Sequence, residues 1–454
     1  MAIKFYNYLT RQKEPFNPIK KGRVGLYTCG PTVYDRVHLG NLRTFIFEDV
    51  LKKTLQLNGY RVKHVMNITD IDDKIIKKMK QEKKTLKQIT LPYLKLFLQD
   101  IKKLNIERAA HFPKATENIK EMIKLIKVLL KKGMAYKGKD NSIYFDISKF
   151  QTYGALSELT KQNIRHGARI ENDEYSKKNA GDFVLWKAFN SIQDKSLTAW
   201  NAAFGKGRPG WHIECSAMSM KYLGKTFDIH AGAVDLLFPH HENEIAQSEA
   251  ATGQKFVNYW LEAEHLLVEN QKMSKSLGNF YTLRDIEKRN INPLAFRYLA
   301  LNSHYRSKLN FTWNAVRKAE EALKNLRSLS FRKIIKREPR NAKKEKEYET
   351  KFIEALNNDL NTPRSLTTTW ELARDAETPQ TSKDKLIEKF DKVLKLGLKT
   401  DFRIPAEITK MAKNREKLRR ENNYEKADQL RQKADNLGWI MEDTPSGPAI
   451  RKKL

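Results

Sequence analysis

A strand–helix–strand pattern near the amino terminus constrains the fold of this chain more than any other feature. Residues 23–29, RVGLYTC, form an apolar run that ends at a Gly-Pro pair, as expected for a strand followed by a breaker. Residues 40–57 place apolar side chains at helical spacing, and an Asn-Gly pair ends that helix. Residues 60–68 predict a second strand. This β-α-β unit predicts a parallel sheet with a right-handed crossover.

The segment between the first strand and the helix predicts a phosphate site. It reads CGPTVYDRVHLGN and holds neither the G-x-G-x-x-G of dinucleotide-binding folds nor a Walker-type phosphate loop. His38, Gly40 and Asn41 stand where the helix begins, and a helix start offers free N–H groups and partial positive charge. Gly40 lets a base or phosphate come close to the backbone, and His38 can donate to phosphate oxygens. A histidine that only caps or packs against the helix is the competing interpretation.

A second basic motif lies far along the chain. Residues 272–276 read Lys-Met-Ser-Lys-Ser, and Leu-Gly-Asn follows, which predicts a small polar loop. Lys272 and Lys275 can reach over a triphosphate and balance the charge of a leaving pyrophosphate. A solvated basic loop is the alternative, because lysine is common in this chain.

Together the two motifs resemble the HIGH and KMSKS signatures of class I aminoacyl-tRNA synthetases. The first matches residues 38–41, with Leu39 for isoleucine and Asn41 for the second histidine, and the second starts 231 residues after it. Asparagine keeps a hydrogen-bond donor there but cannot carry charge. The resemblance implies a Rossmann-type fold split by a large insertion. It also implies catalytic roles for His38, Asn41, Lys272 and Lys275, and nucleotide contacts from Gly40, Lys275 and Ser276.

Candidate zinc ligands are spread over three segments of the chain. Cys29 ends the first strand and Cys215 opens an apparent helix; with only these two cysteines, a disulfide scaffold is excluded and a reducing compartment is expected. In residues 238–249, Pro239 suits a first helical turn and puts His240 and Glu244 on one face. Two cysteines, a histidine and a glutamate complete a four-ligand set for zinc. The alternatives are an inert buried cysteine and a polar helix surface.

Within class I, these residues resemble those of the cysteinyl-tRNA synthetase family. Further matching stretches are residues 67–74, the segment around Trp211, and residues 229–235. In that family a zinc ion recognises the substrate thiol, and the resemblance assigns this ion to Cys29, Cys215, His240 and Glu244. It also implies that Thr69, Trp211 and His230 line the cysteine pocket and that Asp235 lies near the nucleotide.

The predicted fold class is α/β, with all-helical and small mixed domains after the parallel-sheet domain. The catalytic Rossmann-type domain is expected at residues 1–270, with an insertion at about 90–200. Residues 271–330 are expected to hold the KMSKS loop and a stem-contact helical region. Residues 331–400 are predicted to be a helical bundle and 401–454 an anticodon-binding module, as the resemblance implies. The charged stretch 332–348 has few apolar residues and predicts a flexible junction.

The charge balance favours a polyanionic partner. Lys plus Arg total 86 against 54 Asp plus Glu, a net charge of +32. Four basic residues near the carboxyl terminus are candidates for phosphate contact: Arg415, Lys417, Arg419 and Arg420. The alternative is that lysine coats solvated surfaces throughout. Ile450 takes the place of an aromatic residue expected to stack on an anticodon base.

The resemblance implies ATP-dependent joining of cysteine to its tRNA through a cysteinyl-adenylate, with magnesium accompanying ATP. No secretory signal and no apolar run of membrane-spanning length occurs, so a cytoplasmic protein without a membrane partner is expected. A monomer is also expected. Two rivals stay open. One is a cysteine ligase of the same fold with an amino-sugar acceptor, although such an acceptor needs no anticodon module. The other is a non-catalytic RNA-binding protein derived from a synthetase.

Overall fold

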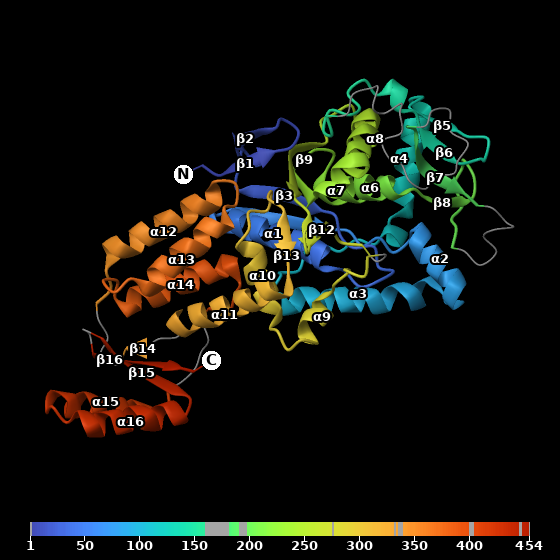
Figure 1. Cartoon of the computed structure of the whole chain (residues 1–454). Helices are drawn as coiled ribbons and strands as arrows, with labels where there is room; N and C mark the ends of the chain where they lie inside the picture. Colours follow the sequence, from blue (N-terminus) through green and yellow to red (C-terminus); the bar gives the residue numbers. More distant parts are fainter. Residues whose placement is uncertain are drawn as a thin grey trace.

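A four-stranded parallel sheet forms the centre of the computed structural model (Figure 1). The structure describes residues 2–158, 181–189, 198–274, 277–330, 333–334, 339–398, 404–444 and 447–453. The strands lie in the order β10 (Val257–Ala263), β9 (Phe227–Ala233), β3 (Arg23–Thr28) and β4 (Arg61–Met66). β3 pairs in parallel with β4 on one side and with β9 on the other. The helix α1 (Leu39–Leu57) crosses between β3 and β4, so the predicted β-α-β unit is confirmed.

Alternate residues of each central strand enter two separate cores, because successive side chains of a strand point to opposite faces. On β3, Leu26 packs with α1, whereas Tyr27 packs with the opposite helices. On β10, Leu261 and Trp260 divide in the same way. That opposite layer contains α4 (Ile119–Lys131), α6 (Trp211–Leu223) and α8 (Glu242–Thr252). Helices therefore cover both faces, as expected for a parallel sheet.

A large insertion separates β4 from β9. It contains α2 (Asp73–Glu82), α3 (Leu86–Lys103), α4 and a four-stranded antiparallel sheet. The strands of that sheet are β5 (Ala135–Lys137), β6 (Ile143–Phe145), β7 (Phe183–Ala188) and β8 (Gly207–Pro209). An amino-terminal hairpin, β1 (Lys4–Asn7) with β2 (Gln12–Pro15), lies beside β10.

After β10 the chain is mostly helical. Three short strands, β11 (Leu266–Val268), β12 (Gln271–Lys272) and β13 (Leu309–Phe311), form a small sheet. The helices α9 (Leu283–Glu287), α10 (Pro293–Leu301) and α11 (Trp313–Ser330) lead to a bundle of α12 (Ala342–Asn357), α13 (Thr362–Arg374) and α14 (Gln380–Leu394). The last module joins α15 (Ala406–Arg420) and α16 (Tyr424–Asn436) to a sheet of β14 (Lys333–Ile334), β16 (Gly447–Lys452) and β15 (Trp439–Thr444). It projects from the rest of the molecule in Figure 1.

The prediction of a flexible junction at 332–348 is wrong for the second half of that stretch. α12 already begins at Ala342, since the Asn341 side chain accepts a hydrogen bond from the backbone N–H of Lys344 and caps the helix. Glu345 lies in the first turn and forms ion pairs with Arg340 and Lys385. A charged stretch can therefore be helical when neighbouring helices supply opposite charges. Within the described residues, no helix has both the length and the apolar character needed to cross a membrane.

A buried arginine ties the bundle to the parallel-sheet domain. Arg297 on α10 is fully buried, pairs with Asp49 of α1 at 2.7 Å and donates to the carbonyls of Leu394 and Leu104. Replacing Arg297 with methionine is expected to lower the stability towards urea by about 3–5 kcal/mol, because the Asp49 charge stays buried without its partner. Lys324→Ala, which removes an exposed lysine paired with Glu320, is the control and should leave the unfolding midpoint unchanged. Equal midpoints for both variants would contradict this account of Arg297.

Candidate functional site

Most predicted site residues meet at the carboxyl edge of the parallel sheet, where ligands bind in open α/β folds. Cys29 follows β3, Thr69 follows β4, and Asp235 follows β9. A cavity of about 580 Å³ lies at the opposite edge, lined by Arg23 and Arg61 among others. We place the site at the carboxyl edge because the candidate ligands gather there.

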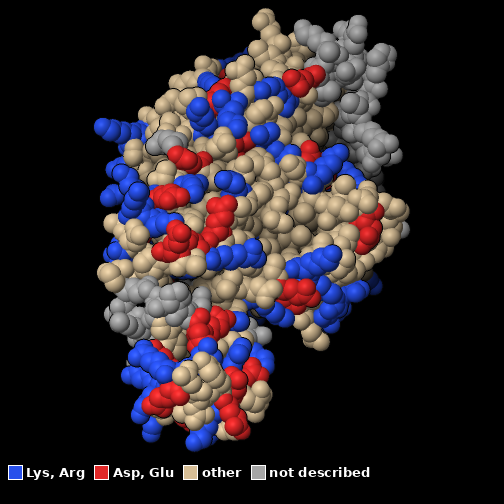
Figure 2. Space-filling view, turned by 60° about the vertical axis from the view of Figure 1, so that its left-hand side comes forward, with Lys and Arg blue, Asp and Glu red and all other residues tan. Residues whose placement is uncertain are grey.

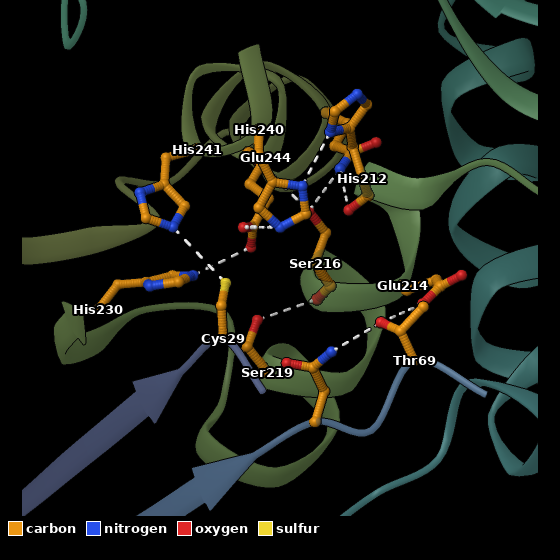
Figure 3. A network of polar contacts seen from close by, with 12 residues as sticks. Cys29, Thr69, His212, Glu214, Ser216, Ser219, His230, His240, His241 and Glu244 are labelled. Carbon is orange, nitrogen blue, oxygen red and sulfur yellow. Dashed lines mark hydrogen bonds and ion pairs between the residues drawn. The ribbon is translucent and has the colours of Figure 1, made fainter. Parts of the chain in front are cut away.

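The four predicted zinc ligands form one buried cluster. Three of them, Cys29, His240 and Glu244, are labelled in Figure 3. One donor atom from each of Cys29, Cys215, His240 and Glu244 lies within 4.8 Å of every other. Cys215 comes from the first turns of α6, and Glu244 from the first turn of α8. Gly30 allows Cys29 to lie at the strand end, because a Cβ there would be 1.7 Å from the Asn67 carbonyl oxygen. Three distant segments thus supply a single donor set.

A second donor set overlaps the first and was not predicted. Cys29 and Glu244 also lie within 4.8 Å of donor atoms of His230 and His241. His241 Nε2 is 3.6 Å from Cys29 Sγ, and its Nδ1 is 2.7 Å from Glu262 Oε1. Two sequence features could have suggested His241 and Glu262: the His-His pair, and a glutamate inside the apolar strand β10. A carboxylate behind a histidine is the usual support for a metal-site ring.

The charges of the cluster are arranged around His240. Burial works to lower the pKa of His240, but Glu244 and Cys215 outweigh it and raise that pKa to about 10. Burial works to raise the pKa of Cys215, but hydrogen bonds from Cys29 and His240 contribute to lowering it to about 6. Burial likewise opposes ionisation of Glu244, whereas His230 and His240 lower its pKa. The cluster therefore stabilises an anionic sulfur and an anionic carboxylate next to a cation.

These residues fit zinc. A tetrahedral ion with bonds of about 2.0–2.3 Å places its ligands roughly 3.3–3.8 Å apart, within the observed spread. Oε1 of Glu244 makes no hydrogen bond within the described residues, although it is buried and 3.1 Å from His240 Nε2. His240 Nδ1 lies 2.9 Å from His212 Nδ1, which orients its other nitrogen towards the carboxylate. Because zinc prefers thiolates, the set with both cysteines is the better match.

The helix that carries Glu244 begins later than predicted. Pro239 is not in its first turn: residues 237–241 form a wider turn, with a cis bond between Phe238 and Pro239, and α8 starts at Glu242. Phe238 has an extended backbone, which interrupts the helix there. His240 and Glu244 still face each other, since the turn and the helix continue in the same direction.

The three predicted cysteine-pocket residues surround this cluster. Trp211 starts α6 with 39% of its surface exposed, and its ring stacks on His240 at 4.3 Å. His230 is fully buried, and its Nε2 is 3.2 Å from Glu244 Oε2. Thr69 is also buried and donates to Glu214 at 3.1 Å, and both lie to the right of Cys29 in Figure 3. Of the three, Trp211 alone presents a large exposed face.

The predicted phosphate motif forms the start of α1. His38 is its N-cap: Nδ1 accepts from the backbone N–H of Asn41 at 3.2 Å, and Asn41 Oδ1 accepts from the His38 N–H at 3.3 Å. His38 therefore caps the helix through Nδ1, and Nε2 is the second nitrogen of its ring. A Cβ on Gly40 would lie 2.9 Å from the His38 ring, so glycine allows this fold-back. Asn41 completes a reciprocal capping box.

The structure brings the two basic motifs together. Leu39 N–H donates to the Tyr281 carbonyl at 2.9 Å, which ties the start of α1 to the segment after the Lys272 loop. Lys272 Nζ lies 3.8 Å from Asp235 Oδ1. Burial opposes ionisation of Asp235, but the hydrogen bond from His265 and nearby positive charges lower its pKa. Lys275 and Ser276, the other predicted nucleotide contacts, lie outside the described residues.

One of the predicted RNA contacts is wrong. Arg415 is 1% exposed and makes two hydrogen bonds to Asp443, so it supports the carboxyl-terminal module from inside. Lys417, Arg419 and Arg420 stay on the surface, each near a carboxylate. Ile450 is fully buried in the core of that module. The face in Figure 2 mixes blue and red side chains, with no large patch of one sign.

Two protein-family models together match most of the chain. The model described as "tRNA synthetases class I (C) catalytic domain" matches residues 15–321, and the DALR domain matches residues 351–398. A cysteine–tRNA ligase of Brachyspira hyodysenteriae is 46% identical, over 99% of this chain and 99% of its own length. The cysteine–tRNA ligase of Protochlamydia amoebophila is 43% identical, over 100% and 98%.

Solved structures agree on the fold. A methionyl-tRNA synthetase of Mycobacterium tuberculosis superposes with a TM-score of 0.59 at 12% identity, covering 83% of this chain and 90% of that one. A leucyl-tRNA synthetase of Agrobacterium radiobacter gives 0.55 at 10% identity, with 84% of each chain covered. The predicted α/β fold class, a Rossmann-type parallel sheet followed by helical and small mixed parts, is confirmed.

Proposed function

The chain belongs to the cysteine–tRNA ligase family of class I aminoacyl-tRNA synthetases, and we propose that it charges its tRNA in two steps. A cysteine carboxylate oxygen attacks the α-phosphorus of ATP, giving cysteinyl-adenylate as pyrophosphate leaves with the electrons of the broken bond. A hydroxyl of the terminal ribose of the tRNA then attacks the cysteinyl carbonyl, and AMP leaves. Such chemistry depends on positioning and charge balance more than on a side-chain nucleophile.

We propose that Cys29, Cys215, His240 and Glu244 hold one zinc ion for cysteine recognition. When bound, the ion would favour a thiolate and lower the pKa of a thiol beside it, which distinguishes cysteine from the harder serine hydroxyl. A site that demands such a partner rejects the analogue by on the order of ten-thousand-fold. Trp211, His230 and Thr69 would shape the pocket around the rest of the amino acid. The single observation that carries this proposal is the buried four-donor cluster.

At the nucleotide end, His38 Nε2 and the ammonium groups of Lys272 and Lys275 would balance charge as pyrophosphate leaves. Gly40 and Ser276 would contact the nucleotide, Asn41 would keep the His38 ring in its capping position, and Asp235 would lie beside the bound ATP, which carries magnesium. The proximity of the helix start to the Lys272 segment supports this division of roles. No residue is needed as a general base.

The tRNA would meet the enzyme through its carboxyl-terminal parts. We propose that residues 331–400 form a helical bundle, that 401–454 bind the anticodon, and that 271–330 contact the stem, beside a catalytic domain of 1–270 with its insertion at about 90–200. Lys417, Arg419 and Arg420 are the proposed phosphate contacts there. The cluster is complete within one chain, which supports a monomer. A role in protein synthesis supports a cytoplasmic location.

The proposed reaction is tested by cysteine-dependent exchange of labelled pyrophosphate into ATP, followed by charging of a tRNA transcript. We expect exchange with cysteine, none with serine, and charged tRNA. Exchange without charging would favour the amino-sugar rival, and no exchange would favour a non-catalytic RNA-binding protein.

Zinc content distinguishes the two overlapping donor sets. Cys215→Ser is expected to lose its zinc on dialysis, because one of two thiolates is gone. His241→Gln is expected to keep about one zinc per chain, since an outer residue costs only about 10–100-fold in metal affinity. Inductively coupled plasma emission spectroscopy measures the zinc content of both variants. If His241→Gln lost the metal while Cys215→Ser kept it, the set with His230 and His241 would be the binding one.

A further inference from the structure

A histidine outside the predicted site shares a carboxylate with the basic loop. His265 follows β10, and its Nδ1 lies 3.2 Å from Asp235 Oδ1. The same oxygen is 3.8 Å from Lys272 Nζ. Asp235 therefore stands between two cations that come from different segments of the chain. No motif pointed to His265, because its role depends on a loop that only the fold brings to Asp235.

The two cations differ in how firmly they are held. The backbone of His265 is anchored on both sides: its carbonyl accepts from Arg43 of α1 at 2.6 Å and from the Leu309 N–H, while its N–H donates to Glu264. Its side chain is 31% exposed. Lys272, in contrast, is 77% exposed at the end of a two-residue strand. His265 is the anchored partner of Asp235, and Lys272 is the one that can leave.

From this arrangement, and on the basis of the function proposed above, we infer that His265 is a positioning residue for ATP: its imidazolium holds Asp235 and so releases Lys272 to the phosphates. A triphosphate has to compete with Asp235 for the Lys272 ammonium. With His265 protonated, Asp235 keeps a partner when Lys272 leaves. With a neutral residue at 265, Asp235 keeps Lys272 more tightly, and ATP binds more weakly.

The protonation state of His265 gives this role a pH signature. The hydrogen bond to Asp235 raises the pKa of His265, supported by the charge of Glu264 and opposed by partial burial and Lys272. Arg43 also faces its backbone, and His38 lies near Asp235. Because the pKa is raised, the proton is present below the ordinary value of about 6.5 and is lost at a higher pH. ATP affinity should therefore fall as pH rises through that window.

Calorimetric titration with magnesium ATP, without cysteine, tests the inference across that pH range. At neutral pH, His265→Gln is expected to weaken ATP binding about three- to fivefold, in line with a partly exposed ion pair, and to lose the part of the pH dependence that His265 causes. His265→Lys keeps a positive charge at pH values where His265 has lost its proton. At those pH values it should bind ATP more tightly than His265→Gln. His111→Gln, an exposed histidine outside the site, is the matched control.

The outcomes separate this inference from the proposed function. A His265→Gln profile that superimposes on that of the unmodified enzyme would overturn the inference, and so would a His265→Lys enzyme as weak as His265→Gln. Pyrophosphate exchange is measured on the same samples. Normal exchange with unaltered profiles rejects only the role of His265, whereas absent exchange with the expected profiles rejects only the two-step reaction.

Discussion

Cysteine-dependent pyrophosphate exchange is expected to disappear in Cys29→Ser, together with bound zinc. The substitution replaces a thiolate donor by a hydroxyl that is far less acidic and a poorer ligand for zinc. Because Cys29 belongs to both possible donor sets, no alternative arrangement of ligands can compensate. We expect a loss on the order of ten-thousand-fold in kcat/KM for cysteine, the factor by which such sites reject analogues.

Ser219→Ala is the matched control for Cys29→Ser. Ser219 is buried on α6 one turn after Cys215, and its hydroxyl donates only to the Ser216 carbonyl among the described residues. This variant should keep both zinc and exchange. A zinc-free Cys29→Ser enzyme that still activates cysteine with normal affinity would show that the metal has no part in recognition.

The second large effect is expected at Lys272. In Lys272→Ala the maximal rate of exchange should fall about 10²–10³-fold, because the donor proposed to balance the developing charge of pyrophosphate is lost. Zinc content should not change, since Lys272 belongs to neither donor set. The rate at saturating cysteine and ATP is the quantity to measure, because the effect belongs to the transition state.

Lys288→Ala is the control for Lys272→Ala. Lys288 is an exposed lysine just after α9 that pairs with Asp285. Lys288→Ala should have an exchange rate within about twofold of that of the unmodified enzyme. If both variants exchanged equally fast, the loop containing Lys272 would be a solvated surface segment, as its composition alone also allows.

The parallel sheet was predictable because its signal is local. Two apolar strands with a helix between them are compatible with few folds other than a β-α-β unit. β3, α1 and β4 lie where the pattern predicts them. The last module combines two helices with a hairpin, in line with the small mixed domain predicted there. Where the prediction was wrong, in the start of α8 and the junction before α12, a turn geometry and contacts with neighbouring helices decide the structure.

The candidate site was predictable only in part. Cys29, Cys215, His240 and Glu244 could be named because thiolates and a spaced His-Glu pair are chemically distinctive. His241, Glu262 and His265 contact partners that are distant in sequence, so the spacing of residues along the chain does not reveal these contacts. The burial of Arg415 was not predictable, because its partner Asp443 lies 28 residues away and its neighbours on the helix are basic.

The most direct test of the account is X-ray absorption at the zinc edge, with and without cysteine. Without substrate, the fitted number of sulfur ligands should be two, from Cys29 and Cys215. Saturating cysteine should raise that number to three, because zinc can accept an added ligand, whereas serine should leave it at two. A sulfur count that stays at two with saturating cysteine would contradict recognition of the substrate thiol by the metal.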